Sequence, residues 1–190
     1  GSTHQLLTTL FPRWGITSAY VDAAKPEDLE KAIQPNTKMI FLETPSNPGL
    51  ELVDLEWLCK IKEKHPQIII NVDNCFATPY LQKPIAYGVD IVSHSATKYM
   101  DGQGRVLGGV VAGRADLIKE MMRDVVQLLD PQEHFLILNT YSLGFSSIIV
   151  ENLIRGAYPK VQNLNIGELY LKAKSGINLP LGVFGKFSSV

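Results

Sequence analysis

The sequence predicts an α/β protein with a mostly parallel, doubly wound sheet, and two features of the chain lead to this class. Short runs rich in β-branched residues alternate with longer amphipathic stretches, in the order β-α-β-α-β-α-β. The chain has 190 residues, 45% of them hydrophobic, which is enough for a core in one domain or in a domain and part of a second. Ligands of such sheets gather at the carboxyl ends of the strands.

The first half of the chain supplies the opening elements of this pattern. Residues 16–21 indicate a strand, and Pro26 begins a helix because proline fits the first turn and acidic residues follow it. The continuous apolar run 39–42 predicts a second strand, which ends at the turn cluster 44–49. Asp54 then caps a helix that presents an apolar face.

The next elements continue the alternation. Residues 68–72 form an uninterrupted β-branched run, which suits a strand covered on both faces. A short helical stretch at 81–87 leads to strands at 89–93 and 106–112, and a helix is expected over 115–128.

Composition and charge exclude several classes of function. The 18 Lys and Arg nearly balance the 19 Asp and Glu, so no global field favours nucleic acid or an anionic membrane. Cys59 and Cys75 lack a CxxC spacing, and the histidines are widely separated, so neither a disulfide framework nor a metal site is indicated. The longest uncharged stretch, 135–150, is short and polar for a membrane span, and no signal peptide is visible. We therefore expect a soluble, cytoplasmic protein.

Polar residues at the strand ends point to a cofactor. Asp73 follows a buried strand, where a carboxylate needs a cation or donors; a helix cap or a structural ion pair is the alternative. Lys98 could act as a nucleophilic amine toward a carbonyl, or could be an ordinary solvated lysine. The hydroxyls of Ser95 and Thr97 beside it can donate to a phosphate. An acid, an amine and hydroxyls together suit pyridoxal phosphate.

Three longer motifs extend this interpretation. The stretches ETPSNP (43–48), VDNCFATPYLQKP (72–84) and HSATKYMDGQGRVLGG (94–109) closely resemble the Cys/Met-metabolism family of pyridoxal-phosphate enzymes, over about residues 1–125. The resemblance implies the aspartate-aminotransferase type of sheet (fold type I), here incomplete. It also implies a partial cofactor-binding domain over 1–126, with a linker helix and the possible start of a C-terminal domain over 127–190.

The resemblance assigns expected roles to the residues at the strand ends. Lys98 would bind the cofactor covalently and later move protons, and Asp73 would pair with the protonated ring nitrogen. Ser95 and Thr97 would hold the phosphate. Asn47 is expected near the 3′-oxygen of the cofactor or the substrate carboxylate; alternatively, Asn47 or Ser46 merely caps the turn. Cys75 is expected to form part of the cofactor wall.

The resemblance also leads to an expected reaction. The loop 101–109 is similar to that of O-succinylhomoserine sulfhydrylases, and Ser2 stands where methionine γ-lyases carry a cysteine. We therefore expect γ-replacement on an O-acylhomoserine by sulfide to give homocysteine, in methionine biosynthesis. Cystathionine γ-synthase and methionine γ-lyase are alternatives, and a non-catalytic fragment with a cofactor half-site is an alternative of another class. The family implies a homotetramer built from dimers. Arg155 is the candidate for the arginine that binds the substrate carboxylate. Residues 158–190 carry no motif.

Overall fold

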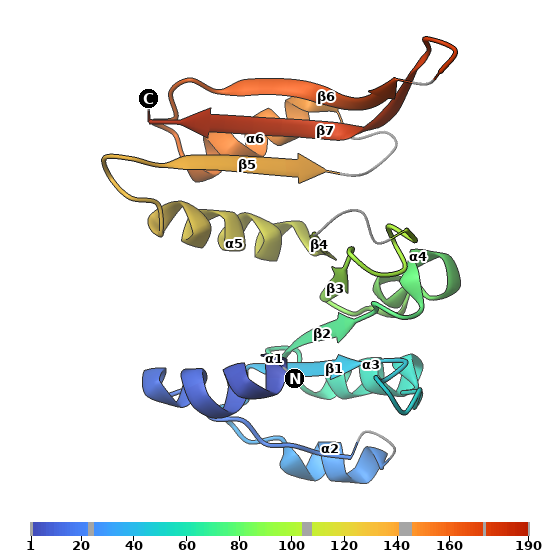
Figure 1. Ribbon diagram of the computed structural model, residues 1–190. Helices are drawn as coiled ribbons and strands as arrows, with labels where there is room; N and C mark the ends of the chain where they lie inside the picture. The colour runs from blue at the N-terminus through green and yellow to red at the C-terminus, as the bar shows by residue number, and fades with distance from the viewer. Residues whose placement is uncertain (1, 23–24, 104–107, 141–145, 173, 190) are drawn as a thin grey trace. The chain divides into compact units, whose positions relative to one another are not determined.

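The computed structural model describes all residues except 1, 23–24, 104–107, 141–145, 173 and 190 (Figure 1). The chain divides into two compact units, Gly1–Gly113 and Arg114–Val190, which are described separately below. The prediction that a cofactor-binding domain ends at residue 126 stays a prediction, because compactness does not assign function.

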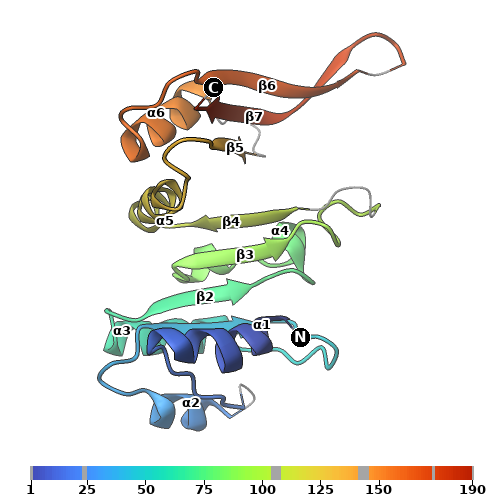
Figure 2. The ribbon, with the colours of Figure 1, turned by 60° about the vertical axis from the view of Figure 1, so that its left-hand side comes forward.

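The first unit is built on a four-stranded sheet in the order β1-β2-β3-β4. The strands are β1 (Met39–Glu43), β2 (Ile69–Asp73), β3 (Ile91–Ser95) and β4 (Gly109–Gly113). The first three are parallel neighbours and β4 is antiparallel to β3. Figure 2 shows β2 and β3 pointing the same way and β4 the opposite way. The predicted α/β class with a mostly parallel sheet is confirmed. The parallel pairing brings the carboxyl ends of β1, β2 and β3 to one edge of the sheet.

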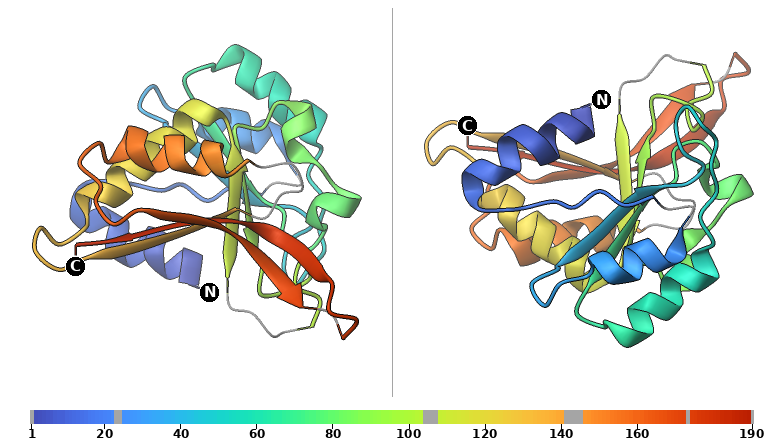
Figure 3. Two further views of the ribbon diagram at one scale, coloured as in Figure 1. Left: turned by 90° about the horizontal axis from the view of Figure 1, so that it is seen from above. Right: turned by 90° about the horizontal axis from the view of Figure 1, so that it is seen from below.

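Helices cover this sheet. Asp54 caps the longest of them, α3, by accepting a hydrogen bond from the backbone N–H of Trp57 at 3.1 Å, which confirms the predicted cap. Figure 3 shows α2 and α3 on the same side of the sheet. The helical segments of the unit are α1 (Ser2–Gln5), η1 (Leu6–Leu10), η2 (Phe11–Trp14), α2 (Pro26–Ala32), α3 (Leu55–Lys64), α4 (Thr78–Leu81) and η3 (Pro84–Tyr87).

The core of the first unit lies between α3 and the sheet. The apolar side chains of α3, spaced at three and four residues, pack with alternate residues of β1 and β2 and with Val92 of β3. Burying one such side chain stabilises the fold by about 1.5–3 kcal/mol. The fully buried members include Leu58, Ile61, Ile68, Ile70 and Val72.

One predicted strand is absent. Residues 16–21 belong to neither of the sheets formed by the described residues. Instead they line one wall of a pocket of about 270 Å³, whose other wall includes Met39, Phe41 and Trp57. A strand requires a hydrogen-bonded neighbour, and an apolar run cannot supply one by itself.

Three other boundaries differ from the expectations. The strand predicted over 89–93 is observed two residues later, as β3 (Ile91–Ser95), so Ser95 lies on the strand and not beyond it. The helical stretch predicted at 81–87 is divided into α4 and η3, with Pro84 near the start of the second. Of the strand predicted over 106–112, residues 106–107 lie outside the described residues, residue 108 is not in a strand, and β4 covers 109–112.

The second unit combines two helices with an antiparallel sheet in the order β5-β7-β6. The stretch 158–190 carries no sequence motif, and its described residues include the antiparallel pair of β6 and β7. Helix α6 packs on this sheet through Val150 and Ile154. Gly185 permits the contact, because a Cβ there would lie 2.4 Å from Ile154 Cδ1. The elements are α5 (Ala115–Gln127), β5 (Phe135–Thr140), α6 (Ser147–Ala157), β6 (Asn165–Lys172) and β7 (Asn178–Ser188).

Candidate active site

The carboxyl edge of the first unit's sheet collects polar side chains on one face. Glu43 and Asp73 are register partners at the ends of β1 and β2, and Asp73 in turn faces Ser93 on β3. Side chains alternate along a strand, so Ser95, two residues beyond Ser93, lies on the same face. The structure therefore brings Glu43, Asp73 and Ser95 together at one edge.

Asp73 has one oxygen engaged and one oxygen open. Its Oδ1 accepts a hydrogen bond from the backbone N–H of Cys75 at 3.0 Å, which fixes the carboxylate at the strand end. Its Oδ2 accepts no hydrogen bond from the part of the chain that the structure describes. The side chain is half-buried. A half-buried carboxylate with an open oxygen is suited to a cationic partner from outside the chain.

Lys98 is held through its backbone, while its side chain is exposed. It lies in the turn after β3, where its N–H donates to the carbonyl of Ser95 at 3.2 Å and its carbonyl accepts from Gly102 at 2.9 Å. Among the described residues its amine makes no hydrogen bond and no ion pair. The backbone of the turn therefore places the base of the side chain and leaves the nitrogen available.

The two hydroxyls beside Lys98 differ in their partners. The hydroxyl of Ser95 makes no hydrogen bond with the described residues. Thr97 Oγ1 accepts from the backbone N–H of Gly108 at 3.0 Å and donates to the Gly108 carbonyl at 3.2 Å. A hydroxyl has one proton to donate, so a phosphate at Thr97 would have to replace the bond to that carbonyl.

The turn after β1 separates the roles of Ser46 and Asn47. Ser46 Oγ accepts from the backbone N–H of Glu51 at 3.1 Å, and the backbone N–H of Ser46 donates to the Glu51 carbonyl at 3.0 Å. Ser46 therefore closes the turn. The side chain of Asn47 is exposed and has no partner among the described residues, which leaves its amide available to a ligand.

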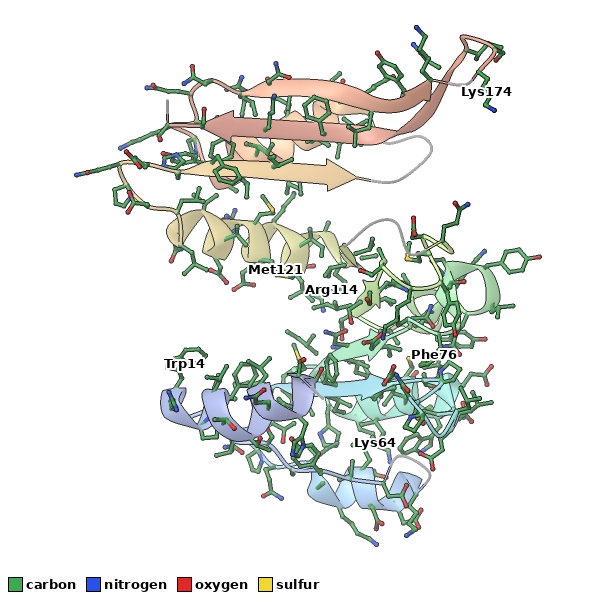
Figure 4. All side chains as sticks on the ribbon, viewed as in Figure 1. Trp14, Lys64, Phe76, Arg114, Met121 and Lys174 are labelled. Carbon is green, nitrogen blue, oxygen red and sulfur yellow. The ribbon has the colours of Figure 1, made fainter. Side chains whose placement is uncertain are left out.

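The segment after β2 is tied to the segment after β3. Cys75 is buried, and its thiol donates to the carbonyl of Ser95 at 3.5 Å. The ring of Phe76, labelled in Figure 4, lies 5.6 Å from that of Tyr99. These two contacts hold the segment that follows Asp73 against the end of β3 and the turn that bears Lys98.

The family assignment comes from comparison with known proteins. The model of the family described as Cys/Met metabolism PLP-dependent enzyme matches residues 1–142 of the chain. The chain belongs to this family. Pyridoxal phosphate is the family's cofactor, so the cofactor expected from the strand-end residues is confirmed at the level of the family.

Individual relatives support the same assignment. The chain is 49% identical to the O-succinylhomoserine sulfhydrylase of Pseudomonas aeruginosa over 122 residues, which cover 64% of the chain and 30% of the relative. It is 46% identical to the L-methionine gamma-lyase of Porphyromonas gingivalis over 121 residues, again 64% of the chain and 30% of the relative. The chain thus spans about a third of the length of these curated relatives.

A solved structure carries the same fold. A putative O-acetylhomoserine (thiol)-lyase from Campylobacter jejuni superimposes with a TM-score of 0.58 and 41% identity, over 62% of this chain and 29% of that chain. The Campylobacter jejuni structure contains a pyridoxyl-lysine monophosphate residue. The predicted fold type I sheet, present here in part, is confirmed by this likeness.

The donor set of the Cys/Met-metabolism chain fits the family cofactor. Asp73 offers an open carboxylate oxygen, Lys98 an open amine and Ser95 an open hydroxyl, all from the ends of neighbouring strands or the turn that follows. These are the groups that a pyridine nitrogen, an aldehyde and a phosphate require.

A buried amide network beneath these residues was not predicted from the sequence. The Asn74 amide donates to the carbonyls of Thr78 and Gln82 at 3.1 and 2.9 Å. The Gln82 amide donates to Asn74 Oδ1 at 2.8 Å and to the Thr44 carbonyl at 2.9 Å. Buried amides must be paired, and this pairing joins the turn after β1 to the segment after β2. Gln82 lies within the motif 72–84, which was the available signal.

Two titratable groups near Asp73 were also missed. Burial lowers the pKa of His94, against the opposing effects of the Asp73 charge and a hydrogen bond with the Asn74 backbone. His94 Nδ1 has no partner among the described residues. Burial, and then the Asp73 charge, raise the pKa of Glu43, against the backbone N–H of Asn47 and the charge of Lys98.

Two further sequence candidates belong to other segments of the chain. Arg155 is on α6 in the second unit, where its Nε donates to Glu151 at 2.8 Å, so it has a local partner. Part of the loop that suggested a sulfhydrylase, residues 104–107, lies outside the described residues.

Proposed function

We propose that this chain carries the cofactor-binding residues of a pyridoxal-phosphate enzyme that acts on a sulfur-related amino acid. In this proposal Lys98 binds the cofactor covalently, Asp73 pairs with its ring nitrogen, and Ser95 and Thr97 bind its phosphate. The observation that carries it is the open carboxylate oxygen of Asp73 on the same sheet edge as the turn that holds the open amine of Lys98. Asn47 would contact the 3′-oxygen or the substrate carboxylate, and Cys75 would form part of the cofactor wall.

The residues of the chain then have distinct tasks. When bound, pyridoxal phosphate withdraws electrons from the α-carbon of an amino acid. Asp73 keeps a proton on the ring nitrogen, because an ionised carboxylate favours the charged form of its partner. The free amine of Lys98 would accept the proton from the substrate α-carbon. The hydrogen bond of the Cys75 thiol and the Phe76–Tyr99 ring contact keep the segments after β2 and β3 in place.

For the whole protein we propose γ-replacement on O-succinylhomoserine by sulfide, giving homocysteine. The 49% identity to the Pseudomonas aeruginosa sulfhydrylase supports this reaction. A γ-elimination on methionine is the second candidate, supported by the 46% identity to the Porphyromonas gingivalis lyase. A panel of O-succinylhomoserine with sulfide, cystathionine and methionine separates them by product: homocysteine for replacement, and an α-keto acid for elimination.

The cofactor assignment is tested on the chain itself. The chain is incubated with pyridoxal phosphate, reduced with borohydride and digested, and the peptide masses are measured by mass spectrometry. The proposal predicts a cofactor adduct on Lys98 that is absent in Lys98→Ala and present in Lys119→Ala, a matched change at an exposed lysine of α5. An adduct without turnover would support the non-catalytic half-site. The absence of a Lys98 adduct in the wild-type chain would overturn the proposal.

Assembly and location stay predictions. A homotetramer built from dimers is expected for the whole protein, and light scattering tests it. A cytoplasmic location is expected as well. Within the described part of the chain, no helix has the length and apolar character needed to cross a membrane.

A further inference from the structure

The side chain of Gln82 connects the turn after β1 to the segment after β2, and neither the motifs nor the family comparison gives this residue a role. Its Nε2 donates to the carbonyl of Thr44 at 2.9 Å and to Asn74 Oδ1 at 2.8 Å. Both acceptors belong to buried residues, since Thr44 is 1% and Asn74 0% exposed. An amide nitrogen carries two protons, and here both are used to join the ends of two neighbouring strands.

The first acceptor, Thr44, lies at the base of the turn that carries Asn47. Thr44 Oγ1 accepts from the backbone N–H of Val53 at 3.0 Å, which closes the base of the turn. Nearer its tip, the Ser46 hydroxyl accepts from the backbone N–H of Glu51 at 3.1 Å. Asn47 lies between these bonded positions and has an exposed side chain. A displacement of Thr44 is therefore passed on to Asn47.

The second acceptor, Asn74, lies beside the carboxylate that the proposed function assigns to the ring nitrogen. The backbone N–H of Asn74 donates to the Ser93 carbonyl at 2.9 Å and ties this segment to β3. The N–H of the next residue, Cys75, holds Asp73 Oδ1 at 3.0 Å. The direction of the Asp73 carboxylate therefore depends on a segment whose middle residue is Asn74.

The need to pair buried amides explains the bonds that Asn74 makes within its own segment, whereas the bond from Gln82 to Thr44 joins residues 38 positions apart. The two segments that it joins carry the Asn47 amide and the Asp73 carboxylate, and ligand-binding groups must be held within a fraction of an ångström. We propose that Gln82 is a positioning residue that sets the turn of Asn47 relative to the Asp73 carboxylate. The inference rests on the proposed function, in which both groups contact the cofactor or its substrate.

The test measures binding of N-(phosphopyridoxyl)methionine, the reduced adduct of the cofactor with an amino acid. This probe carries the ring nitrogen, the 3′-oxygen, the phosphate and the α-carboxylate together, so it reports on Asn47 whichever of its two expected contacts that residue makes. The probe has no aldehyde, so its binding requires no bond to Lys98. Calorimetry gives the affinities of wild type, Gln82→Met, Asn47→Ala and the double variant. The matched control is Gln67→Met, at an exposed glutamine in the turn before β2.

The expected result is a loss of affinity that depends on Asn47. Gln82→Met should weaken binding of the probe about three- to tenfold by itself, and by less than about twofold when Asn47→Ala is already present, because residues that act through one another are not additive. Gln67→Met should bind the probe as wild type does. An equal loss with and without Asn47→Ala would mean that Gln82 supports the fold alone, and would overturn the inference.

Amide hydrogen exchange separates a local loosening of the turn from a general loss of stability. In Gln82→Met the N–H groups of Glu51 and Val53 should exchange faster, while those of α3 should be unchanged. Uniform acceleration, or unchanged exchange in the turn, contradicts the positioning role. The isosteric Gln82→Glu is measured in parallel, so the result does not depend on the folding of one variant. A wild-type chain that fails to bind the probe contradicts the proposed function instead, so the two failures are distinguishable.

Discussion

The aspartates at the two ends of the first unit's sheet differ in how their carboxylates are paired. At the amino end, Asp90 precedes β3 with its side chain 3% exposed; its Oδ2 meets Lys62 Nζ at 2.7 Å and the backbone N–H of Ile70 at 2.9 Å. The same lysine donates to the Ile68 carbonyl. At the carboxyl end, Asp73 has an open oxygen and Lys98 an amine without a hydrogen bond or ion pair among the described residues. The paired charges hold the fold together, and the unpaired charges are available to a ligand.

The largest effect is expected at the paired end. Asp90→Ala removes the partner of Lys62, whose side chain is 18% exposed, and should lower the free energy of unfolding of the first unit by about 3 kcal/mol. Urea unfolding measures the change. Asp28→Asn, at an exposed i,i+3 pair, is the control and should cost under about 0.5 kcal/mol. Equal stability of Asp90→Ala and wild type would show that the buried pair is not structural.

Asp73→Ala should affect cofactor binding much more than stability. Loss of a charge-assisted bond to the ring nitrogen should weaken cofactor binding about 10- to 100-fold, while loss of the acceptor for the Cys75 N–H should cost about 1 kcal/mol of stability, less than Asp90→Ala does. A binding titration by absorption, run beside urea unfolding, separates the two effects. If Asp73→Ala unfolds the chain as readily as Asp90→Ala does, the distinction between the two ends is wrong.

Disrupting the buried amide network should lower both the stability of the first unit and its affinity for the cofactor, by intermediate amounts. Asn74→Ala removes one hydrogen bond each from the Gln82 amide, the Gln82 carbonyl and the Thr78 carbonyl, which should cost about 2 kcal/mol of stability. It should also weaken cofactor binding, because Asn74 adjoins Asp73. Gln82→Glu, which replaces the donor by a carboxylate facing the Thr44 carbonyl, should resemble it. Cofactor binding unchanged in both variants would contradict a positioning role.

The smallest effect concerns pH. Burial lowers the pKa of His94 below its ordinary value of 6.5, so the unfolded chain takes up this proton more readily than the folded chain. Stability from neutral His94 is present above pH 6.5 and is lost as the pH falls toward the depressed pKa. Unfolding free energies at several pH values should fall over this window in wild type and fall less in His94→Gln. Parallel curves would show that His94 does not contribute.

Local sequence patterns account for much of the fold. The capped helix from Asp54, the apolar run that became β2 and the helix that begins at Pro26 each depend on residues close in the chain. Residues 16–21 failed as a strand because pairing requires a neighbour, which periodicity cannot reveal. The hairpin of β6 and β7 was missed because its register depends on distant contacts, such as that of Gly185 with α6.

The candidate site likewise contains residues that local sequence patterns predict and residues that they do not. Asp73, Ser95 and Lys98 were predicted because each follows or ends a recognisable strand. The link between Asn74, Gln82 and Thr44 spans up to 38 residues, and the face shared by Glu43 and Asp73 depends on strand register. Both are tertiary features without a local pattern, so they needed the structure.

The most direct test of the proposed cofactor site is the crystal structure of the chain grown with pyridoxal phosphate. The proposed roles of Lys98 and Asp73 predict continuous density from Lys98 Nζ to the cofactor, with the ring nitrogen about 2.7–2.9 Å from Asp73 Oδ2. A cofactor bound to another lysine, or a ring nitrogen directed away from Asp73, would contradict them.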